Sequence, residues 1–161
     1  MSHVAIRPLA REDWGSVARI YADGLATGVA SFETDVPAWE DWDAGHLAAL
    51  RLVAELDGAV AGWLAAAPVS RRDCYRGVVE HSVYVDGAMQ GRGVGRALLE
   101  RLVAEAPAHA IWTIQTSIIA SNEPSLRLHE SVGFRVVGRR ERIAERDGVW
   151  HDTLLLELRL P

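Results

Sequence analysis

The stretch Gln90-Gly91-Arg92-Gly93-Val94-Gly95 decides the fold, because it joins a segment with the hydrophobic pattern of a strand to one with the hydrophobic pattern of a helix. The apolar run before it, Val78–Val85, is typical of a strand, and the amphipathic run after it, Arg96–Ala106, is typical of a helix. Glycines between a strand and a helix let several backbone N–H groups turn toward one point. The helix N-terminus adds unpaired N–H groups and a partial positive charge. The stretch therefore predicts a binding site for a phosphate or diphosphate group.

Spacing separates this loop from two other nucleotide-binding motifs. The dinucleotide fingerprint G-x-G-x-x-G would need a glycine at position 96 or 98, where the chain has Arg96 and Leu98. A P-loop needs a Gly-Lys pair, and the chain contains none. The remaining pattern, Q-x-x-G-x-G, resembles the acetyl-CoA pyrophosphate loop of the GNAT N-acetyltransferases. An ordinary glycine-rich turn between a strand and a helix stays open as the alternative.

The composition predicts one globular domain over residues 1–161. Of the 161 residues, 49% are hydrophobic and 24% are charged, which is enough for a sizeable core. The net charge of −5 argues against a general nucleic-acid binder. The longest uncharged apolar run, Ala59–Val69, is too short to cross a bilayer, so no membrane partner is expected. The single cysteine, Cys74, cannot form an internal disulfide, which fits a cytoplasmic location.

Hydrophobic periodicity and turn signals predict elements in the order β-α-α-β-β-β-α-β-α-β-β. Asp-Gly pairs at positions 57–58 and 147–148 indicate two tight hairpin turns. The predicted fold class is α+β, with helices packed on a mostly antiparallel sheet. Strands are expected over Val4–Arg7, Leu52–Leu56, Ala59–Ala67, Val78–Val85, Ile111–Ile118, Phe134–Ala144 and Val149–Leu158. Helices are expected from Glu12 to Leu25, over Pro37–Leu50, over Arg96–Ala106 and over Asn122–Val132.

Several further segments resemble the GNAT superfamily and, within it, the phosphinothricin and methionine-sulfoximine acetyltransferases. The order of elements agrees, and Asn122–Phe134 looks like a second GNAT signature, an Asn-led helix ending in Gly-Phe. The narrower group is indicated by the motifs at Ala30–Thr34, Val79–Val85, Arg127–Glu130 and Trp150–Asp152. The resemblance implies a GNAT fold, a mixed sheet whose fourth and fifth strands run parallel and splay apart between flanking helices. It also implies a homodimer.

The reaction implied by this resemblance is acetyl transfer from acetyl-CoA to the α-amine of a small amino acid or analogue. Phosphinothricin, methionine sulfoximine and methionine sulfone are the acceptors it suggests, with herbicide or antibiotic resistance as a role that could be a side activity. One alternative keeps the chemistry and changes the acceptor to a polyamine, an aminoglycoside or a protein N-terminus. A second alternative is a non-catalytic module that binds acetyl-CoA.

Glu80 is the candidate general base. It sits in the middle of a predicted central strand, where an unpaired carboxylate is costly to bury. Only a neutral amine attacks a thioester, and transfer of a proton from an α-amine to an ordinary glutamate is uphill by roughly 5 kcal/mol. A desolvated carboxylate with a raised pKa narrows that gap, and a bridging water would serve equally. The alternative is a partly exposed or ion-paired Glu80 without a catalytic role.

The resemblance also places the cofactor contacts. It implies that the strand backbone binds the pantetheine arm, that the glycine loop binds the pyrophosphate, and that the Asn-led helix contributes its first turn. A backbone N–H of the strand could also polarise the thioester carbonyl. Arg92 and Arg96 could equally be ordinary solvated arginines, and Asn122 could merely cap its helix. The expected cofactor-binding residues are Val83, Tyr84, Val85, Gln90, Gly91, Arg92, Gly93, Val94, Gly95, Arg96, Asn122 and Ser125.

His129 stands where many GNAT enzymes have a tyrosine that protonates the leaving thiolate, so it is a second candidate catalytic residue. Packing or hydrogen bonding is its structural alternative. The resemblance implies substrate contacts from Phe32, Glu33, Arg72, Tyr75 and His151, although core packing would explain Phe32 and a surface hairpin would explain His151. Ser70 replaces a residue that is usually basic in this group, which weakens the case for tight phosphinothricin binding. No histidine or cysteine pattern has metal-ligand spacing, so no metal is expected.

Overall fold

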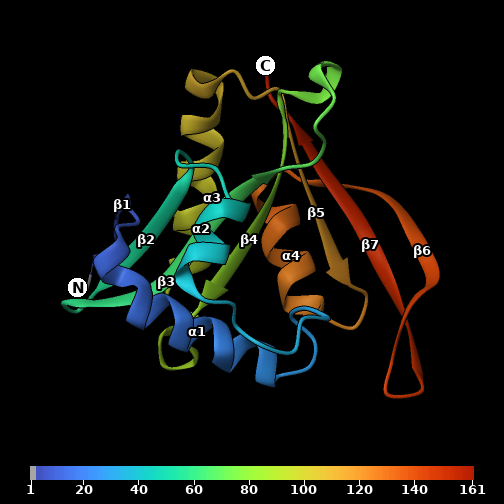
Figure 1. Ribbon diagram of the computed structural model, residues 1–161, viewed down its shortest axis with the longest axis horizontal. Helices are drawn as coiled ribbons and strands as arrows, with labels where there is room; N and C mark the ends of the chain where they lie inside the picture. The colour runs from blue at the N-terminus through green and yellow to red at the C-terminus, as the bar shows by residue number, and fades with distance from the viewer. Residues whose placement is uncertain (1–2) are drawn as a thin grey trace.

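The computed structural model describes residues 3–161 and is built around one seven-stranded sheet (Figure 1). The strand order is β1-β2-β3-β4-β5-β7-β6, and every neighbouring pair is antiparallel except β4 and β5, which run parallel. This confirms the predicted α+β class. The strands are β1 (Ala5–Pro8), β2 (Arg51–Leu56), β3 (Ala59–Pro68), β4 (Val78–Val85), β5 (Thr113–Ile119), β6 (Arg135–Arg146) and β7 (Val149–Arg159). Met1 and Ser2, the start of the domain expected over 1–161, lie outside the described residues.

Four α-helices flank the sheet in the described part of the chain. They are α1 (Trp14–Ala26), α2 (Trp39–Gly45), α3 (Val94–Glu105) and α4 (Glu123–Val132). Short 3-10 turns connect other elements at Arg11–Asp13, Asp73–Tyr75, Gly87–Met89 and Ala106–His109. Across residues 3–161, none of the helices has the length and apolar character that a bilayer crossing requires.

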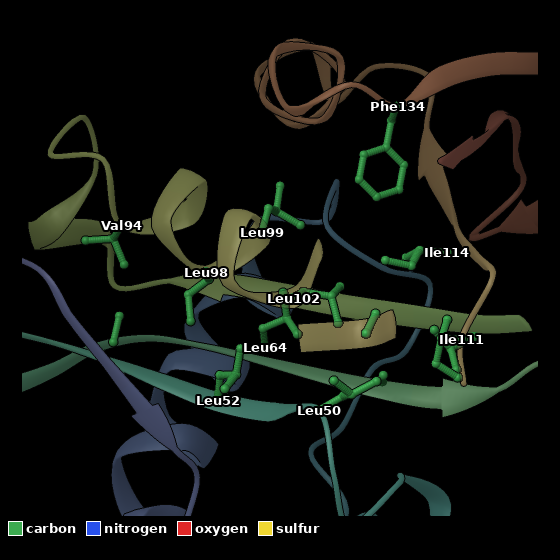
Figure 2. Close-up of a cluster of buried hydrophobic side chains, with 14 of the residues drawn as sticks. Leu50, Leu52, Leu64, Val94, Leu98, Leu99, Leu102, Ile111, Ile114 and Phe134 are labelled. Atoms are coloured by element: carbon green, nitrogen blue, oxygen red, sulfur yellow. The ribbon is translucent and has the colours of Figure 1, made fainter. Parts of the chain in front are cut away.

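Alternation along the strands divides the core between the two faces of the sheet. On β2, Leu52 and Ala54 belong to a cluster with α3, whereas Val53 belongs to a cluster with α1 and α2. Figure 2 shows Leu98 and Leu102 of α3 above the sheet residues Leu52 and Leu64. Full burial of each such leucine contributes about 1.5–3 kcal/mol to stability, so α3 and the glycine loop that precedes it are firmly anchored.

The parallel pair β4–β5 is short, and this creates the opening that contains the site. Only Val78, Val79 and Glu80 of β4 pair with β5, although β4 continues to Val85. Along the same stretch, β4 remains paired to β3 on its other side. From residue 81 onward, β4 has no pairing with β5 along this edge, which confirms the splayed strands that the resemblance implied.

The expected helix over Pro37–Leu50 is too long at its C-terminal end, because α2 already ends at residue 45. The following segment lies along β3 instead: the Leu47 N–H donates to the Ala66 carbonyl at 2.9 Å, and the Ala66 N–H donates to the Leu50 carbonyl at 3.1 Å. The buried guanidinium of Arg51 binds two carbonyl oxygens of this segment, those of His46 and Leu47, and a third at Asp43 in α2. These long-range bonds replace the helical ones, so Leu50 is buried by pairing rather than by a helix face.

The hairpin turns agree with their sequence signals. Asp57 and Gly58 have φ of 54° and 79°, and Asp147 and Gly148 have φ of 53° and 77°. Two consecutive positive φ values are what a type I′ turn requires. The two Asp-Gly predictions are confirmed. Helix α3 starts at Val94, two residues earlier than its apolar pattern alone indicated.

Candidate active site

The opening between β4 and β5 holds two adjoining cavities. The first, called here the glycine-loop cleft, has a volume of about 510 Å³ and lies between the glycine loop, β4 and the start of α4. The second, called here the Glu80 pocket, has a volume of about 270 Å³ and lies deeper between β4 and β5. Residues that line both are Ala30, Val83, Tyr84, Asn122 and Ser125. The two cavities therefore meet at one junction beside the unpaired edge of β4.

The glycine loop has the backbone geometry of an anion site. Gly91 and Gly93 adopt φ of 75° and 82°, a region that residues with a Cβ rarely enter. The first intrahelical bond comes from the Ala97 N–H to the Gly93 carbonyl, at 3.0 Å. The three N–H groups before it have no carbonyl partner within the helix, and the N-cap glycine has no side chain to cap them. This loop fits a pyrophosphate group.

Close packing fixes the loop against α4. A Cβ added at Gly95 would lie 2.9 Å from Leu128 Cδ2, so only a glycine lets the two helices approach this closely. The strand edge at Val83, Tyr84 and Val85 lines the cleft and carries the backbone amides that an extended amide-bearing arm could pair with. The residues present therefore fit acetyl-CoA.

The two arginines expected at the pyrophosphate differ in position. Arg96 lines the cleft while its Nε donates to Glu100 at 2.8 Å. Arg92 is absent from the cleft lining, and its guanidinium contacts Asp57 at 3.0 Å and the Met89 sulfur at 3.4 Å. Gln90 lines the cleft. The role of Arg92 in cofactor binding stays a prediction.

Asn122 serves two structural purposes at the junction. Its side-chain oxygen accepts a hydrogen bond from the Ser125 N–H at 3.3 Å, which caps α4, and its amide nitrogen donates to the Val29 carbonyl at 3.3 Å. The predicted cap is confirmed. The second bond ties α4 to the loop after α1, which walls both cavities through residues 29–32.

Glu80 occupies the last paired position of β4, at the point where the strands separate. Its side chain is reached by solvent through the pocket, yet surrounding protein desolvates the carboxylate and raises its pKa. The positive charge of Arg140, on β6, acts in the opposite direction on that pKa. Arg140 Nη2 also lies 3.4 Å from the hydroxyl of Ser117, which lines the pocket. Arg140 is not part of the pocket lining, but its contact with Ser117 places its charge beside the pocket that contains Glu80.

His129 lies below the junction and is paired with a second histidine that sequence analysis did not single out as functional. Its Nε2 is 2.9 Å from Nε2 of His81 on β4, and the exposed fractions of the two residues are 2% and 4%. Burial lowers the pKa of both imidazoles, that of His81 to about 3. The pair is therefore neutral at physiological pH.

The residues expected to contact substrate are only partly brought together. Phe32 lines the Glu80 pocket and packs against His151 of β7 with ring centroids 5.5 Å apart. Neither His151 nor Glu33 is part of the lining of the two cavities. Arg72 and Tyr75 lie on the exposed connection before β4, outside both linings, and the Arg72 N–H donates to the Ser70 hydroxyl at 3.1 Å. Their substrate contacts stay predictions.

Arg140 and Arg146 are the site residues that sequence reasoning missed. Arg146 donates to the carbonyl oxygens of Gly28 and Ser31, which holds the loop that walls both cavities. The pairing of β6 with β7 shifts register twice, once before and once after Arg140. An alternating pattern cannot be carried through such shifts, so the sequence offered no signal for which β6 arginines lie close to the site.

Within residues 3–161, no group of three or more His, Cys, Asp or Glu side chains is arranged to hold a metal ion.

Comparison with known proteins agrees with this geometry. The model of the acetyltransferase (GNAT) family matches residues 7–134, and the chain belongs to that family. Among curated proteins, a phosphinothricin N-acetyltransferase of Streptomyces viridochromogenes is 32% identical over 154 residues, covering 92% of this chain and 84% of that protein. An L-methionine sulfoximine/L-methionine sulfone acetyltransferase of Salmonella typhimurium is 38% identical over 109 residues, covering 68% of this chain and 64% of that protein.

Solved structures give the same result. A Salmonella typhimurium protein solved with acetyl-CoA superposes with a TM-score of 0.89 at 30% identity, covering 98% of this chain and 94% of that one. A structure described as a putative phosphinothricin N-acetyltransferase superposes with a TM-score of 0.87 at 33% identity, covering 99% of both chains. The predicted enzyme class, an acetyl-CoA-dependent N-acetyltransferase of the GNAT fold, is confirmed.

Proposed function

We propose that this enzyme acetylates the α-amine of a small amino acid or analogue, such as phosphinothricin, methionine sulfoximine or methionine sulfone, with Glu80 as general base. The observation that carries the proposal is the position of Glu80 in a small pocket that meets the glycine-loop cleft. A donor bound in the cleft and an acceptor bound in the pocket would meet at the junction. That arrangement favours direct attack by the amine over a covalent acetyl-enzyme intermediate.

Each part of the chain has a defined task in this mechanism. The first-turn N–H groups after Gly93 hold the pyrophosphate, and the unpaired edge of β4 at Val83–Val85 holds the pantetheine arm and offers an N–H to the thioester carbonyl. Glu80, with its raised pKa, accepts the proton that the amine loses, directly or through one water. Arg140 lies beside this pocket, against Ser117, where its guanidinium could bind the carboxylate of the acceptor.

The volume and charge of the site support a small amino-acid acceptor over a polyamine or an aminoglycoside. A volume of about 270 Å³ suits a molecule of amino-acid size. A polycation would be repelled by Arg140, and Glu80 is the single carboxylate in the described lining. The names of three relatives fit this class, among them an L-amino acid N-acyltransferase of Escherichia coli that is 38% identical over 109 residues.

We also propose a homodimer formed through the β6–β7 face. The edge strand β6 is exposed along most of its length, and apolar side chains gather there and at the hairpin tip. The exposed residues are Val136, Val137, Ile143, Val149 and Trp150. Sedimentation equilibrium tests this proposal: a dimer that Trp150→Glu dissociates is the expected result, and a wild-type monomer at micromolar concentration would overturn it. A cytoplasmic location is proposed with it.

A free-thiol assay with acetyl-CoA tests the acceptor class. The panel is phosphinothricin, methionine sulfoximine, methionine sulfone and spermidine, and Arg140→Met is compared with Arg127→Met, whose arginine lies on the exposed side of α4. We expect turnover of the glutamate analogues alone. We also expect the KM for the acceptor to rise about tenfold or more in Arg140→Met and to stay unchanged in Arg127→Met. Turnover of spermidine alone would overturn the acceptor class. Acetyl-CoA binding without turnover of any amine would indicate a non-catalytic module.

A further inference from the structure

The bonds of His129 determine which of its nitrogens carries the proton. Its Nδ1 lies 2.7 Å from the carbonyl oxygen of Ser125, one turn earlier on α4. A carbonyl oxygen can only accept a hydrogen bond, so Nδ1 must be protonated. In a neutral imidazole the other nitrogen then has a lone pair, and the 2.9 Å contact requires His81 Nε2–H to donate to His129 Nε2.

This assignment leaves His129 without a proton to give to a leaving group. Its Nδ1–H is used by the helix carbonyl, and its Nε2 is an acceptor that His81 already occupies. The remaining nitrogen of the pair, His81 Nδ1, is buried and has no hydrogen-bond partner among the described residues. Although both histidines line the Glu80 pocket, the pair is a fixed, buried support of the junction rather than a proton donor to it.

Ser125 is the group that this support leaves available. Its hydroxyl oxygen is 3.4 Å from His129 Nδ1, where the nitrogen is the donor, so the hydroxyl can only accept there and its own hydrogen remains unused. Ser125 is half-buried and lines both the glycine-loop cleft and the Glu80 pocket. Its hydroxyl therefore lies at the junction where a donor thioester and an acceptor amine would meet.

We infer that Ser125 is a catalytic hydrogen-bond donor to the thioester sulfur of acetyl-CoA, and that His81 and His129 are positioning residues for its hydroxyl. This inference rests on the proposed acetyl transfer. As the amine nitrogen bonds to the acetyl carbon, the carbon–sulfur bond breaks and its electron pair stays on sulfur. The amine proton passes to Glu80, and the thiolate leaves as an anion stabilised by the Ser125 hydroxyl, which keeps its proton. Solvent protonates the thiolate after release.

Single-turnover rates of acetyl transfer test the role of the hydroxyl. Ser125→Ala removes the hydroxyl but keeps the main-chain N–H that Asn122 caps and the carbonyl that His129 binds. A rate loss of about 10- to 100-fold is expected, because a hydrogen bond to a developing charge is lost. Acetyl-CoA affinity by calorimetry should change less than about threefold, Ser125→Thr should restore most of the rate, and Ser131→Ala on the same helix should match wild type. A wild-type rate in Ser125→Ala would overturn the inference.

Nitrogen-15 NMR of the imidazoles tests the support independently of activity. At neutral pH the expected spectrum shows His129 protonated at Nδ1 and His81 protonated at Nε2, and His81→Leu should slow single turnover without changing acetyl-CoA affinity. A proton on His129 Nε2 would overturn the tautomer assignment and restore His129 as an acid. An acetyl-transfer rate in Glu80→Gln equal to that of wild type would refute the proposed function instead. The two failures are therefore distinguishable.

Discussion

Replacing Arg146 by methionine should loosen the loop that walls both cavities. The guanidinium at the end of β6 donates to the carbonyl oxygens of Gly28 and Ser31 and lies 5.8 Å from the ring of Phe32. Methionine keeps most of the apolar stem and removes both donors. A hydrogen bond from a charged donor contributes about 1.5–3 kcal/mol when buried, and half-exposure here reduces this to about 1 kcal/mol each.

The two bonds together amount to about 2 kcal/mol, which corresponds to a population change of about 30-fold. Because the loop contributes Val29 to the cleft and Phe32 to the Glu80 pocket, this cost should appear in kcat/KM. We expect a 10- to 30-fold fall in kcat/KM and faster amide hydrogen exchange at residues 28–32, with an intermediate effect for Arg146→Lys. A kcat/KM within twofold of wild type together with unchanged exchange would refute the reasoning.

Three further predictions concern stability and pH. A Cβ at Gly62 would lie 2.8 Å from the Tyr84 carbonyl oxygen and 2.9 Å from Val94 Cγ1, so Gly62→Ala should cost about 3 kcal/mol in urea unfolding, and an unchanged midpoint would contradict this. The Arg7 guanidinium lowers the pKa of Asp13 below 3.8, so ionised Asp13 stabilises the fold above that pH and the contribution is lost as pH falls through the lowered value. Asp13→Asn should therefore cost about 2 kcal/mol at pH 7 and less near pH 3, whereas an equal cost at both would argue against the pairing. Burial raises the pKa of Glu80 and Arg140 opposes this rise, so the acidic limb of the kcat/KM profile should move to higher pH in Arg140→Met; a stationary limb would separate Arg140 from the base.

Local signals in the sequence predicted the order of helices, strands and turns, because neighbouring residues in the chain determine most of these elements. Positive φ values favour glycine at positions 91 and 93, and type I′ turns favour the two Asp-Gly pairs. The first turn of α4 needs the cap that Asn122 supplies. The apolar stripe of α3 packs on one face of β2, and the alternating residue Val53 of β2 packs on the other. The glycine loop was therefore predictable as a site from residues that lie next to one another in the chain.

The parts that could not be predicted depend on contacts between distant residues. Leu50, with φ of 58°, lies outside any helix because Arg51 and β3 bind its segment, and no local preference reports such bonds. His81 and His129 are 48 positions apart, and their pairing appears only when α4 packs against β4. Arg140 contacts Ser117 at the edge of the Glu80 pocket, and the register of β6 against β7 shifts on either side of Arg140.

The most direct test of the central claim is acetyl transfer by Glu80→Gln, measured as thiol release alongside calorimetric titration with acetyl-CoA. Glutamine keeps the size of the side chain and its polarity, but it cannot accept the amine proton. The account predicts acetyl-CoA affinity close to wild type and a turnover number about 10²- to 10⁴-fold lower at neutral pH. A variant that binds acetyl-CoA and turns over at the wild-type rate would remove Glu80 from the mechanism.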